Sequence, residues 1–312
     1  MSQDKTEHRE PSLWGIFFRG LAMGAADVVP GVSGGTIAFI SGIYERLLGA
    51  LAACSPRALM VWRQRGLRAF WQHIDGTFLL VLITGVVTSI ALLARLIATW
   101  LETSPHLVWS FFCGLIALSV PMLMRQIHGW RTVTVSQFIG GCVVALVIAF
   151  WRPEALHVSF PIIFFSGMFA SCAMILPGIS GSFMLLLVGM YAPVLNAVKA
   201  LDVMFLLTFV AGAIAGLMIF SKVLHYLYER YKEAALAVLS GFLLGSLLLV
   251  WPWQVLPVAA DTSMKAAMVN AQRVMPDTYA NLSGKDPQVL GCIFLVILGA
   301  VLVYQLERRW RI

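Results

Sequence analysis

Charged residues are scarce in this chain, and their scarcity excludes a soluble globular protein. Asp, Glu, Lys and Arg make up 12% of its 312 residues, whereas apolar residues make up 60%, and the mean hydropathy is +0.85. Apolar runs of about twenty residues recur along the whole length, which predicts several membrane-spanning helices. The excess of 22 Lys and Arg over 15 Asp and Glu is typical of membrane topology, so we expect no nucleic-acid partner.

Cysteine and histidine are also scarce, and neither occurs at a spacing typical of metal sites or disulfide frameworks. The five cysteines stand singly, the chain has no Cys-x-x-Cys pair, and its six histidines form no pair at a ligand spacing. Single cysteines in apolar segments are typical of small buried hydrophobic side chains. We therefore expect no metal and no cofactor. The polar first twelve residues lead to no cleavage site, so we expect no cleavable signal peptide.

A short motif, Pro-Gly-(Val/Ile)-Ser-Gly, occurs twice inside apolar sequence. It spans residues 30–34 and again 177–181, and seven of the nineteen positions from 30 to 48 are identical at an offset of 147. Pro and Gly break helices, and a break at membrane depth is tolerated only where the backbone is buried in protein or lines a cavity. Two breaks at matching places in two halves indicate the substrate site of a transporter.

Each motif ends in residues that are suited to hold an anion. Each would begin a half-helix, whose first N–H groups have no intrahelical partner and lie at the positive end of the helix dipole. Glycine allows a ligand to approach the backbone and the hydroxyl groups add donors, so the pattern favours phosphate or carboxylate. If the two tips meet near the membrane midplane, they would hold one anionic group between them; the alternative is a tight turn with a serine N-cap. The candidate phosphate-binding residues are Ser33, Gly34, Gly35, Thr36, Ser180, Gly181 and Ser182.

The apolar segments predict an all-α, polytopic membrane protein. Residues 13–52 and 160–197 are each broken by the motif, and we expect two re-entrant helical hairpins because the arms of the first are too short to span; two tilted spanning helices are the alternative there. After the first hairpin we expect a basic loop that contains Arg57, Arg63, Arg65 and Arg68. A long loop, 251–287, contains one short helix. About six full spans are expected, at 77–100, 107–124, 133–151, 203–221, 234–250 and 288–305.

The positive charges favour one orientation of this layout. If the N-terminus is cytoplasmic and each hairpin returns to its starting side, fifteen Lys and Arg fall in cytoplasmic segments and five fall outside. This bias predicts that both termini are cytoplasmic. It does not distinguish a re-entrant hairpin from two full spans, because both return the chain to the same side.

Three spans separate the hairpins, so the second hairpin enters the membrane from the opposite side. Identities at an offset of 131 extend the similarity between the halves: Phe111, Gly114, Leu118 and Pro121 match Phe242, Gly245, Leu249 and Pro252. We therefore expect inverted-topology repeats, the architecture of alternating-access carriers. The single membrane domain, 1–312, would consist of repeat one (13–124), a connecting span (133–151), repeat two (160–252), an extracytoplasmic loop (253–287) and a last span (288–306).

Four charged residues near the motifs are candidate coupling or charge partners: Asp27, Glu45, Arg46 and Arg19. A carboxylate at membrane depth is costly and usually functional, so Asp27 could pair with a cation, carry a coupled proton or cap the turn. Arg46 could balance a phosphate, pair with Glu45 or extend to the interface, and Arg19 could contact phosphate or the interface. The counterpart of Asp27 in the second copy is Met174, so the two tips differ chemically.

The run from Gly24 to Thr36, with Gly42-Ile43-Tyr44-Glu45, resembles the signature of the bacterial polyprenyl-phosphate transporter family. Its members, PopT-type undecaprenyl-phosphate translocases, were long catalogued as a domain of unknown function. The second copy, 176–182, also fits, and the resemblance covers about residues 13–306. It implies a flippase of the bacterial inner membrane that returns undecaprenyl phosphate, the lipid carrier of cell-wall and surface-glycan synthesis, from the outer to the cytoplasmic leaflet. The phosphate would lie at the paired tips and the tail in lipid, without a cofactor, with proton or ion coupling left open.

Two other functions remain open. A small-anion secondary transporter would use the same tips with a closed aqueous path. A membrane enzyme that acts on lipid phosphates would need a general acid or nucleophile set, which the chain does not supply. The Gly-x-Ser-x-Gly pattern at 31–35 serves as a nucleophile elbow only between a strand and a helix, with a His and an acid nearby, so we expect no enzyme. The residues carry no signal for an oligomeric state.

Overall fold

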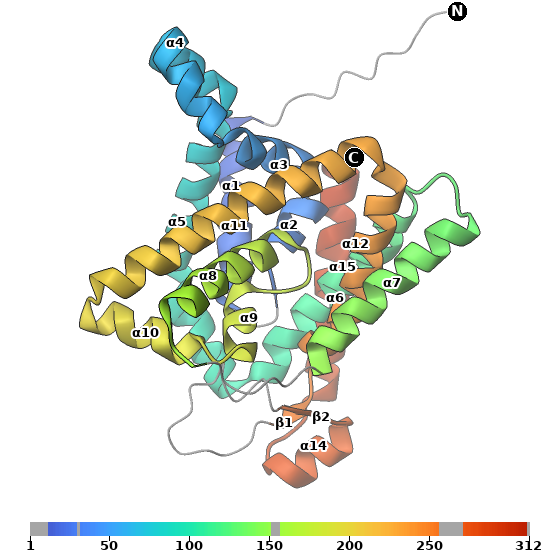
Figure 1. Ribbon diagram of the computed structural model, residues 1–312. Coiled ribbons are helices and arrows are strands. Elements are labelled where there is room, and N and C mark those ends of the chain that lie inside the picture. The colour runs from blue at the N-terminus through green and yellow to red at the C-terminus, as the bar shows by residue number, and fades with distance from the viewer. Residues whose placement is uncertain (1–11, 30–31, 151–156, 256–270, 311–312) are drawn as a thin grey trace, which may run out of the picture.

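A computed structural model describes residues 12–29, 32–150, 157–255 and 271–310, and nearly all of their regular structure is helical (Figure 1). Six helices of the described residues are long and apolar enough to cross a membrane, which confirms the six predicted spans. The chain is therefore an all-α polytopic membrane protein. The six are α5 (Gly76–Thr103), α6 (Pro105–Met124), α7 (Thr132–Phe150), α11 (Val203–Arg230), α12 (Lys232–Ser246), which continues as the 3-10 helix η1 (Leu247–Val250), and α15 (Val289–Trp310).

Two further segments are broken into three shorter helices each. The first consists of α1 (Leu13–Val28), α2 (Gly34–Ile40) and α3 (Tyr44–Ala53), and the second of α8 (Phe160–Ile175), α9 (Gly181–Leu187) and α10 (Tyr191–Ala200). Corresponding helices have equal lengths and start 147 residues apart. The turns before α3 and α10 contain Gly42 and Gly189, and both have a φ of 72°. Glycine adopts this left-handed conformation without steric cost, so the same chemistry makes both turns.

The later helices recur at a different offset. α5 starts at residue 76 and α11 at 203, and α6 starts at 105 and α12 at 232, so both pairs are 127 residues apart. Close helix contacts follow the same offset, because Gly114 packs on the carbonyl of Val296 and Gly241 packs on the carbonyl of Phe138. The helices therefore align at 127 and not at the expected 131. The two registers differ by about one helical turn, which leaves the same helix face in contact.

The segment that the sequence predicts as a basic loop is helical, so this prediction is wrong. α4 (Pro56–His73) has Pro in its first turn, where a missing N–H is tolerated, and reverses direction at Gly66, where φ is 81° and ψ is 176°. It therefore consists of two short helices joined at a kink, and it projects from one end of the bundle (Figure 1). Apolar residues at helical spacing, Leu67, Phe70 and Trp71, indicate this helix, but the interspersed arginines obscure the pattern.

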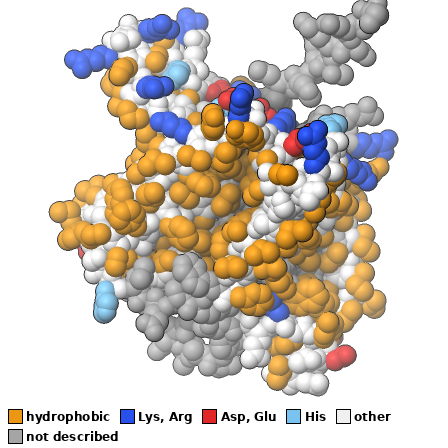
Figure 2. All heavy atoms as spheres, turned by 45° about the vertical axis from the view of Figure 1, so that its right-hand side comes forward, with side chains coloured by type: hydrophobic (Ala, Val, Ile, Leu, Met, Phe, Trp, Pro, Cys, Tyr) orange, Lys and Arg blue, Asp and Glu red, His pale blue; other side chains and the backbone are white. Residues whose placement is uncertain are grey.

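The two ends of the bundle differ in charge. α4, the start of α1 and the end of α15 lie at one end (Figure 1), and Lys and Arg side chains gather there (Figure 2); we call it the basic end. The antiparallel strands β1 (Gln254–Val255) and β2 (Gln272–Arg273) and the helix α14 (Pro276–Ser283) lie at the opposite end. α14 is the short helix predicted in this loop, whose residues 256–270 lie outside the described residues. Which end faces the cytoplasm stays a prediction.

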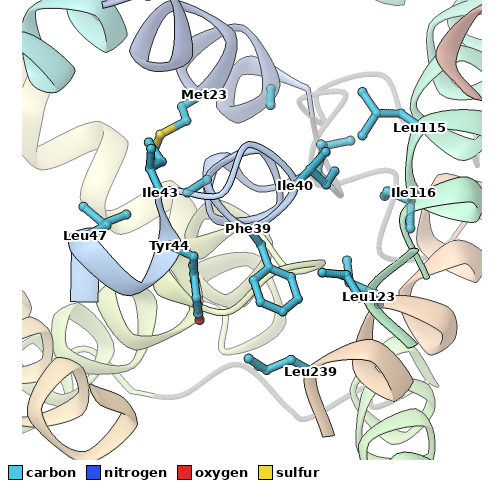
Figure 3. Packing of buried hydrophobic residues seen from close by; sticks show 14 of the residues in the cluster. Met23, Phe39, Ile40, Ile43, Tyr44, Leu47, Leu115, Ile116, Leu123 and Leu239 are labelled. Carbon is cyan, nitrogen blue, oxygen red and sulfur yellow. The ribbon is translucent and has the colours of Figure 1, made fainter. Parts of the chain in front are cut away.

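The first broken segment lies in the middle of the bundle. Phe39 and Ile40 of α2 are buried and point toward Leu115, Ile116 and Leu123 of α6 (Figure 3). α1 packs along α5 and α8 packs along α11, so each broken segment is fastened to one long helix. This packing holds the break between α1 and α2 in the protein interior.

Candidate functional site

A serine caps each of the two short helices that follow the breaks. The Oγ of Ser33, before α2, accepts a hydrogen bond from the N–H of Gly35 at 3.1 Å. The Oγ of Ser180, before α9, accepts one from the N–H of Phe183 at 3.2 Å and shares a hydrogen bond of 3.1 Å with Ser182. N-cap serines satisfy backbone donors that the first helical turn leaves unpaired. The serine N-cap expected as the simplest interpretation of the motif is therefore present in both copies.

The two breaks also touch each other, although about 140 residues separate them in sequence. The hydroxyl of Ser33 donates to the carbonyl of Met174 at 3.2 Å, and the N–H of Gly178 donates to Thr36 Oγ1 at 2.8 Å. A Cβ on Gly35 would lie 2.7 Å from the carbonyl oxygen of Ile175, so only glycine allows this approach. The structure thus brings the first tip against the backbone that precedes the second tip.

The polar groups of this contact are buried and satisfied by one another. Ser33 and Thr36 are fully buried, Ser180 and the three tip glycines are buried, and Ser182 is half-buried. Besides the contacts above, the N–H of Thr36 donates to the carbonyl of Ser33 at 2.9 Å. A buried donor or acceptor without a partner is costly, so these groups hold the two breaks together. We call this arrangement the closed tip contact.

Asp27 lies where the sequence analysis expects an anion on the first tip. Its Oδ1 accepts a hydrogen bond from the N–H of Gly34, the first residue of α2, at 2.6 Å. A Cβ on Gly34 would lie 2.7 Å from the other carboxylate oxygen, so glycine is needed for this approach. A carboxylate at a helix N-terminus is favoured by the helix dipole. Of the three roles considered for Asp27, the observed contact corresponds to capping. Its counterpart Met174 is exposed and has no carboxylate.

Arg46 lies away from the tips. Its guanidinium makes two hydrogen bonds to the carboxylate of Asp75, at 2.5 and 3.1 Å, and lies 4.6 Å from the ring centre of Phe78. Such a two-bond pair fixes the geometry of both side chains. Asp75, at the start of α5, is a partner that the sequence analysis did not consider, because 29 residues separate it from Arg46. The pair connects α3 to α5 near the basic end.

Glu45 and Arg19 also lie apart from the tips. Glu45 lies 3.7 Å from the ammonium group of Lys232, and both side chains are more than half exposed, so the pair adds little stability. Arg19 is only 6% exposed, and its Nε donates to the carbonyl of Ser41 at 3.2 Å. Ser41 follows the C-terminal end of α2, where a cation is favoured by the helix dipole. Arg19 therefore binds the end of α2 opposite to the tip.

Tyr44 is a site residue to which the sequence analysis assigned no role. Its side chain is 2% exposed, its hydroxyl donates to the carbonyl of Ile175 at 3.2 Å, and its ring packs on Phe39. The hydroxyl adds a third hydrogen bond between the first segment and the second break. The recurrence of Gly and Tyr after each motif was the available signal, because it marks the turn that positions this side chain.

An apolar cavity of about 320 Å³ runs along α8 next to the second break. Gly181 at the start of α9 packs against the carbonyl of Ala170, which lies on the same stretch of α8. Both phenylalanines at its mouth, Phe165 and Phe169, are exposed on the outer surface of the bundle. The cavity is lined by Ile162, Phe165, Ser166, Met168, Phe169, Cys172 and Val188.

Comparisons with known proteins agree on one family. A family model described as undecaprenyl phosphate translocase-like matches residues 23–268. A protein of Vibrio cholerae serotype O1 named polyprenyl-phosphate transporter is 44% identical over 293 residues, which cover 94% of this chain and 95% of that protein. A protein of Staphylococcus aureus with the same name is 33% identical over 258 residues, or 77% of this chain and 86% of that protein. No solved structure matches the chain significantly.

Proposed function

Because the chain belongs to the undecaprenyl phosphate translocase-like family, we propose that it is a flippase for undecaprenyl phosphate. It returns this lipid carrier from the outer to the cytoplasmic leaflet of the bacterial inner membrane, where cell-wall and surface-glycan synthesis use it again. The closed tip contact carries the proposal, because it concentrates hydroxyl and backbone donors inside an otherwise apolar bundle. Phosphate is the headgroup that such donors bind best.

The proposal includes inverted repeats with two re-entrant hairpins. α1 starts and α3 lies at the basic end, whereas α10 lies toward the opposite end (Figure 1), and three spans connect the two broken segments. Equal helix lengths at fixed offsets support this arrangement. α7 packs on α12 and α15 packs on α6, which favours α7 and α15 as equivalent last spans of the two repeats. The repeats would then cover about 13–150 and 160–310, with α4 and the loop around α14 as insertions.

The phosphate binds by replacing protein groups at the tips. On the first tip the candidate donors are the hydroxyls of Ser33 and Thr36 with the N–H groups of Gly34 and Gly35. On the second tip they come from Ser180, Gly181 and Ser182. Because the first set is already bonded inside the protein, binding requires the two tips to separate. Rocking of one repeat against the other opens the closed tip contact toward one leaflet and then toward the other, as alternating access requires.

Asp27 couples this opening to a proton in our proposal. Its carboxylate occupies the N-terminus of α2 through the bond to Gly34, and a phosphate in the same place would repel it. Protonation removes that charge and frees the tip for the substrate. A hydrogen bond to a charged group contributes about 1.5–3 kcal/mol, so the exchange between the carboxylate and the phosphate is close to balanced. Arg19 and Arg46 hold structural positions in this account.

The polyprenyl tail remains in lipid while the phosphate crosses. The cavity along α8 favours this, because its lining is apolar and its mouth faces outward beside the second break. The route that it offers leads from the lipid-facing surface to the start of α9. A small-anion transporter would not need such an opening.

A reconstitution experiment separates the three candidate functions. Purified protein in vesicles is given a labelled undecaprenyl phosphate and, separately, labelled inorganic phosphate. Redistribution of the lipid between leaflets without release of phosphate supports the flippase. Release of inorganic phosphate from the lipid supports an enzyme, and uptake of the soluble anion supports a small-anion transporter.

A further inference from the structure

α4 is an insertion that one half of the molecule has and the other lacks. α3 ends at Ala53 and α5 starts at Gly76, whereas α10 ends at Ala200 and α11 starts at Val203. The extra residues form the kinked helix α4, which stands clear of the bundle at the basic end (Figure 1). An element that the fold does not need in its second half indicates a role outside the transport path.

The charge of α4 has one sign. Between Pro56 and His73 the sequence contains four arginines and one histidine and neither Asp nor Glu. All four arginine side chains are exposed: Arg57, Arg63, Arg65 and Arg68. No acidic neighbour within the helix balances them, so the surface of α4 attracts anions.

The same helix exposes large apolar side chains. Leu59, Met60, Trp62 and Leu67 are each more than half exposed, and Trp71 is 39% exposed. The space-filling view shows hydrophobic and basic side chains next to one another on this projection (Figure 2). Exposed apolar groups of this size beside cations mark an interaction surface rather than an ordinary solvated face.

The shape of α4 is held from within and at its base. The chain reverses at Gly66, and the rings of Trp62 and Phe70 on the two sides of the kink lie 6.4 Å apart. At the base, Trp71 Nε1 donates to Thr77 Oγ1 at 3.0 Å and its ring packs on Gly76. Its tip therefore presents a formed surface.

We propose that α4 is an interfacial anchor that binds the anionic phospholipid headgroups on the basic side of the membrane. Helices with arginines on one face and Trp or Leu on the other lie in the headgroup region, where the apolar groups enter the acyl boundary and the cations meet lipid phosphates. Arginine can reach a headgroup while its stem lies along apolar surface. A second copy of this chain fits less well, because it would bring the same unbalanced positive charge to the contact.

The test places a polarity-sensitive fluorophore on a cysteine at position 67 of the full chain, with the five native cysteines replaced. The protein is reconstituted into phosphatidylcholine vesicles with and without phosphatidylglycerol. We expect a blue shift of the emission only with the anionic lipid. The shift should disappear when salt rises from 0.1 M to 1 M, because the Debye length falls from about 10 Å to about 3 Å. A label at position 64, between the arginines, should stay in water.

Two matched variants separate the anchor from the general charge of the basic end. Replacing Arg57, Arg63, Arg65 and Arg68 with Gln should abolish the lipid-dependent shift, since each cation near an anionic surface strengthens association about fivefold and four of them on the order of several hundred-fold. The control removes the same charge outside α4 by replacing Arg125, Arg131, Lys222 and Arg230 with Gln. This control should keep the shift.

Three results would overturn the proposal. They are a label at 67 that stays in water in anionic vesicles, an equal shift in neutral vesicles, and cross-linking between labels at 67 of two copies in proportion to the protein-to-lipid ratio. The last result would assign the surface to a second copy. None of these readings requires transport, so the anchor stands or falls independently of the flippase proposal.

Discussion

Replacement of Thr36 by valine removes a single polar atom from the closed tip contact. Valine is close to threonine in volume but has no hydroxyl, so the buried N–H of Gly178 loses the acceptor that lies 2.8 Å away. A buried N–H without a partner costs about 1–3 kcal/mol. If the separated tips allow that N–H to be solvated, the ratio of closed to separated molecules falls about 5- to 150-fold.

Hydrogen exchange of the segment 174–184, measured by mass spectrometry on protein in lipid nanodiscs, reports this ratio. We expect the Thr36→Val protein to exchange faster by up to that factor. We also expect it to transport undecaprenyl phosphate more slowly, because the hydroxyl is a proposed phosphate donor. Thr36→Ser keeps the hydroxyl and should resemble the unaltered protein in both measurements. Unchanged exchange and unchanged transport in Thr36→Val would refute the reasoning, because the contact would then neither hold the tips nor serve the substrate.

Three further predictions concern the tips, the proton and the topology. Gly181→Leu should abolish transport in folded protein, because its side chain would meet the carbonyl of Ala170, whereas Gly140→Leu should be harmless because nothing lies within 4 Å of its Cβ position; transport by folded Gly181→Leu would contradict this. Asp27→Asn should remove the pH dependence of transport while lipid-phosphate binding stays measurable, and a retained pH profile at normal folded yield would exclude proton carriage. A single cysteine at position 64 should be protected from an impermeant thiol reagent added outside cells while one at 285 reacts; the reverse would invert the orientation.

The spans and both broken segments could be predicted from the sequence because their signals are local. Apolar runs of about twenty residues give α5 and α6 directly, and Pro with Gly marks each break. The register of the later helices was missed by one turn, because four chance-aligned identities at 131 look as convincing as helix starts at 127. α4 was missed because its arginines suggested a loop and Gly66 interrupts its apolar pattern.

The contacts at the site were less accessible, because they join residues far apart in sequence. The motif predicted which donors the tips carry, but not that Thr36 would accept from Gly178 or that Asp27 would cap Gly34. Likewise nothing near Arg46 in the sequence indicated Asp75, since the intervening α4 separates them. Local chemistry therefore fixes the candidate residues, whereas their partners depend on how the two halves pack.

Leaflet redistribution of labelled undecaprenyl phosphate by purified protein in vesicles tests the central claim most directly. The account predicts that the unaltered protein moves the lipid from one leaflet to the other without releasing inorganic phosphate. It also predicts that a folded, membrane-inserted Gly34→Leu protein does not, because its side chain would displace the Asp27 carboxylate and block the tip. Redistribution by Gly34→Leu at the normal rate, or no redistribution by the unaltered protein beyond that of empty vesicles, would contradict it.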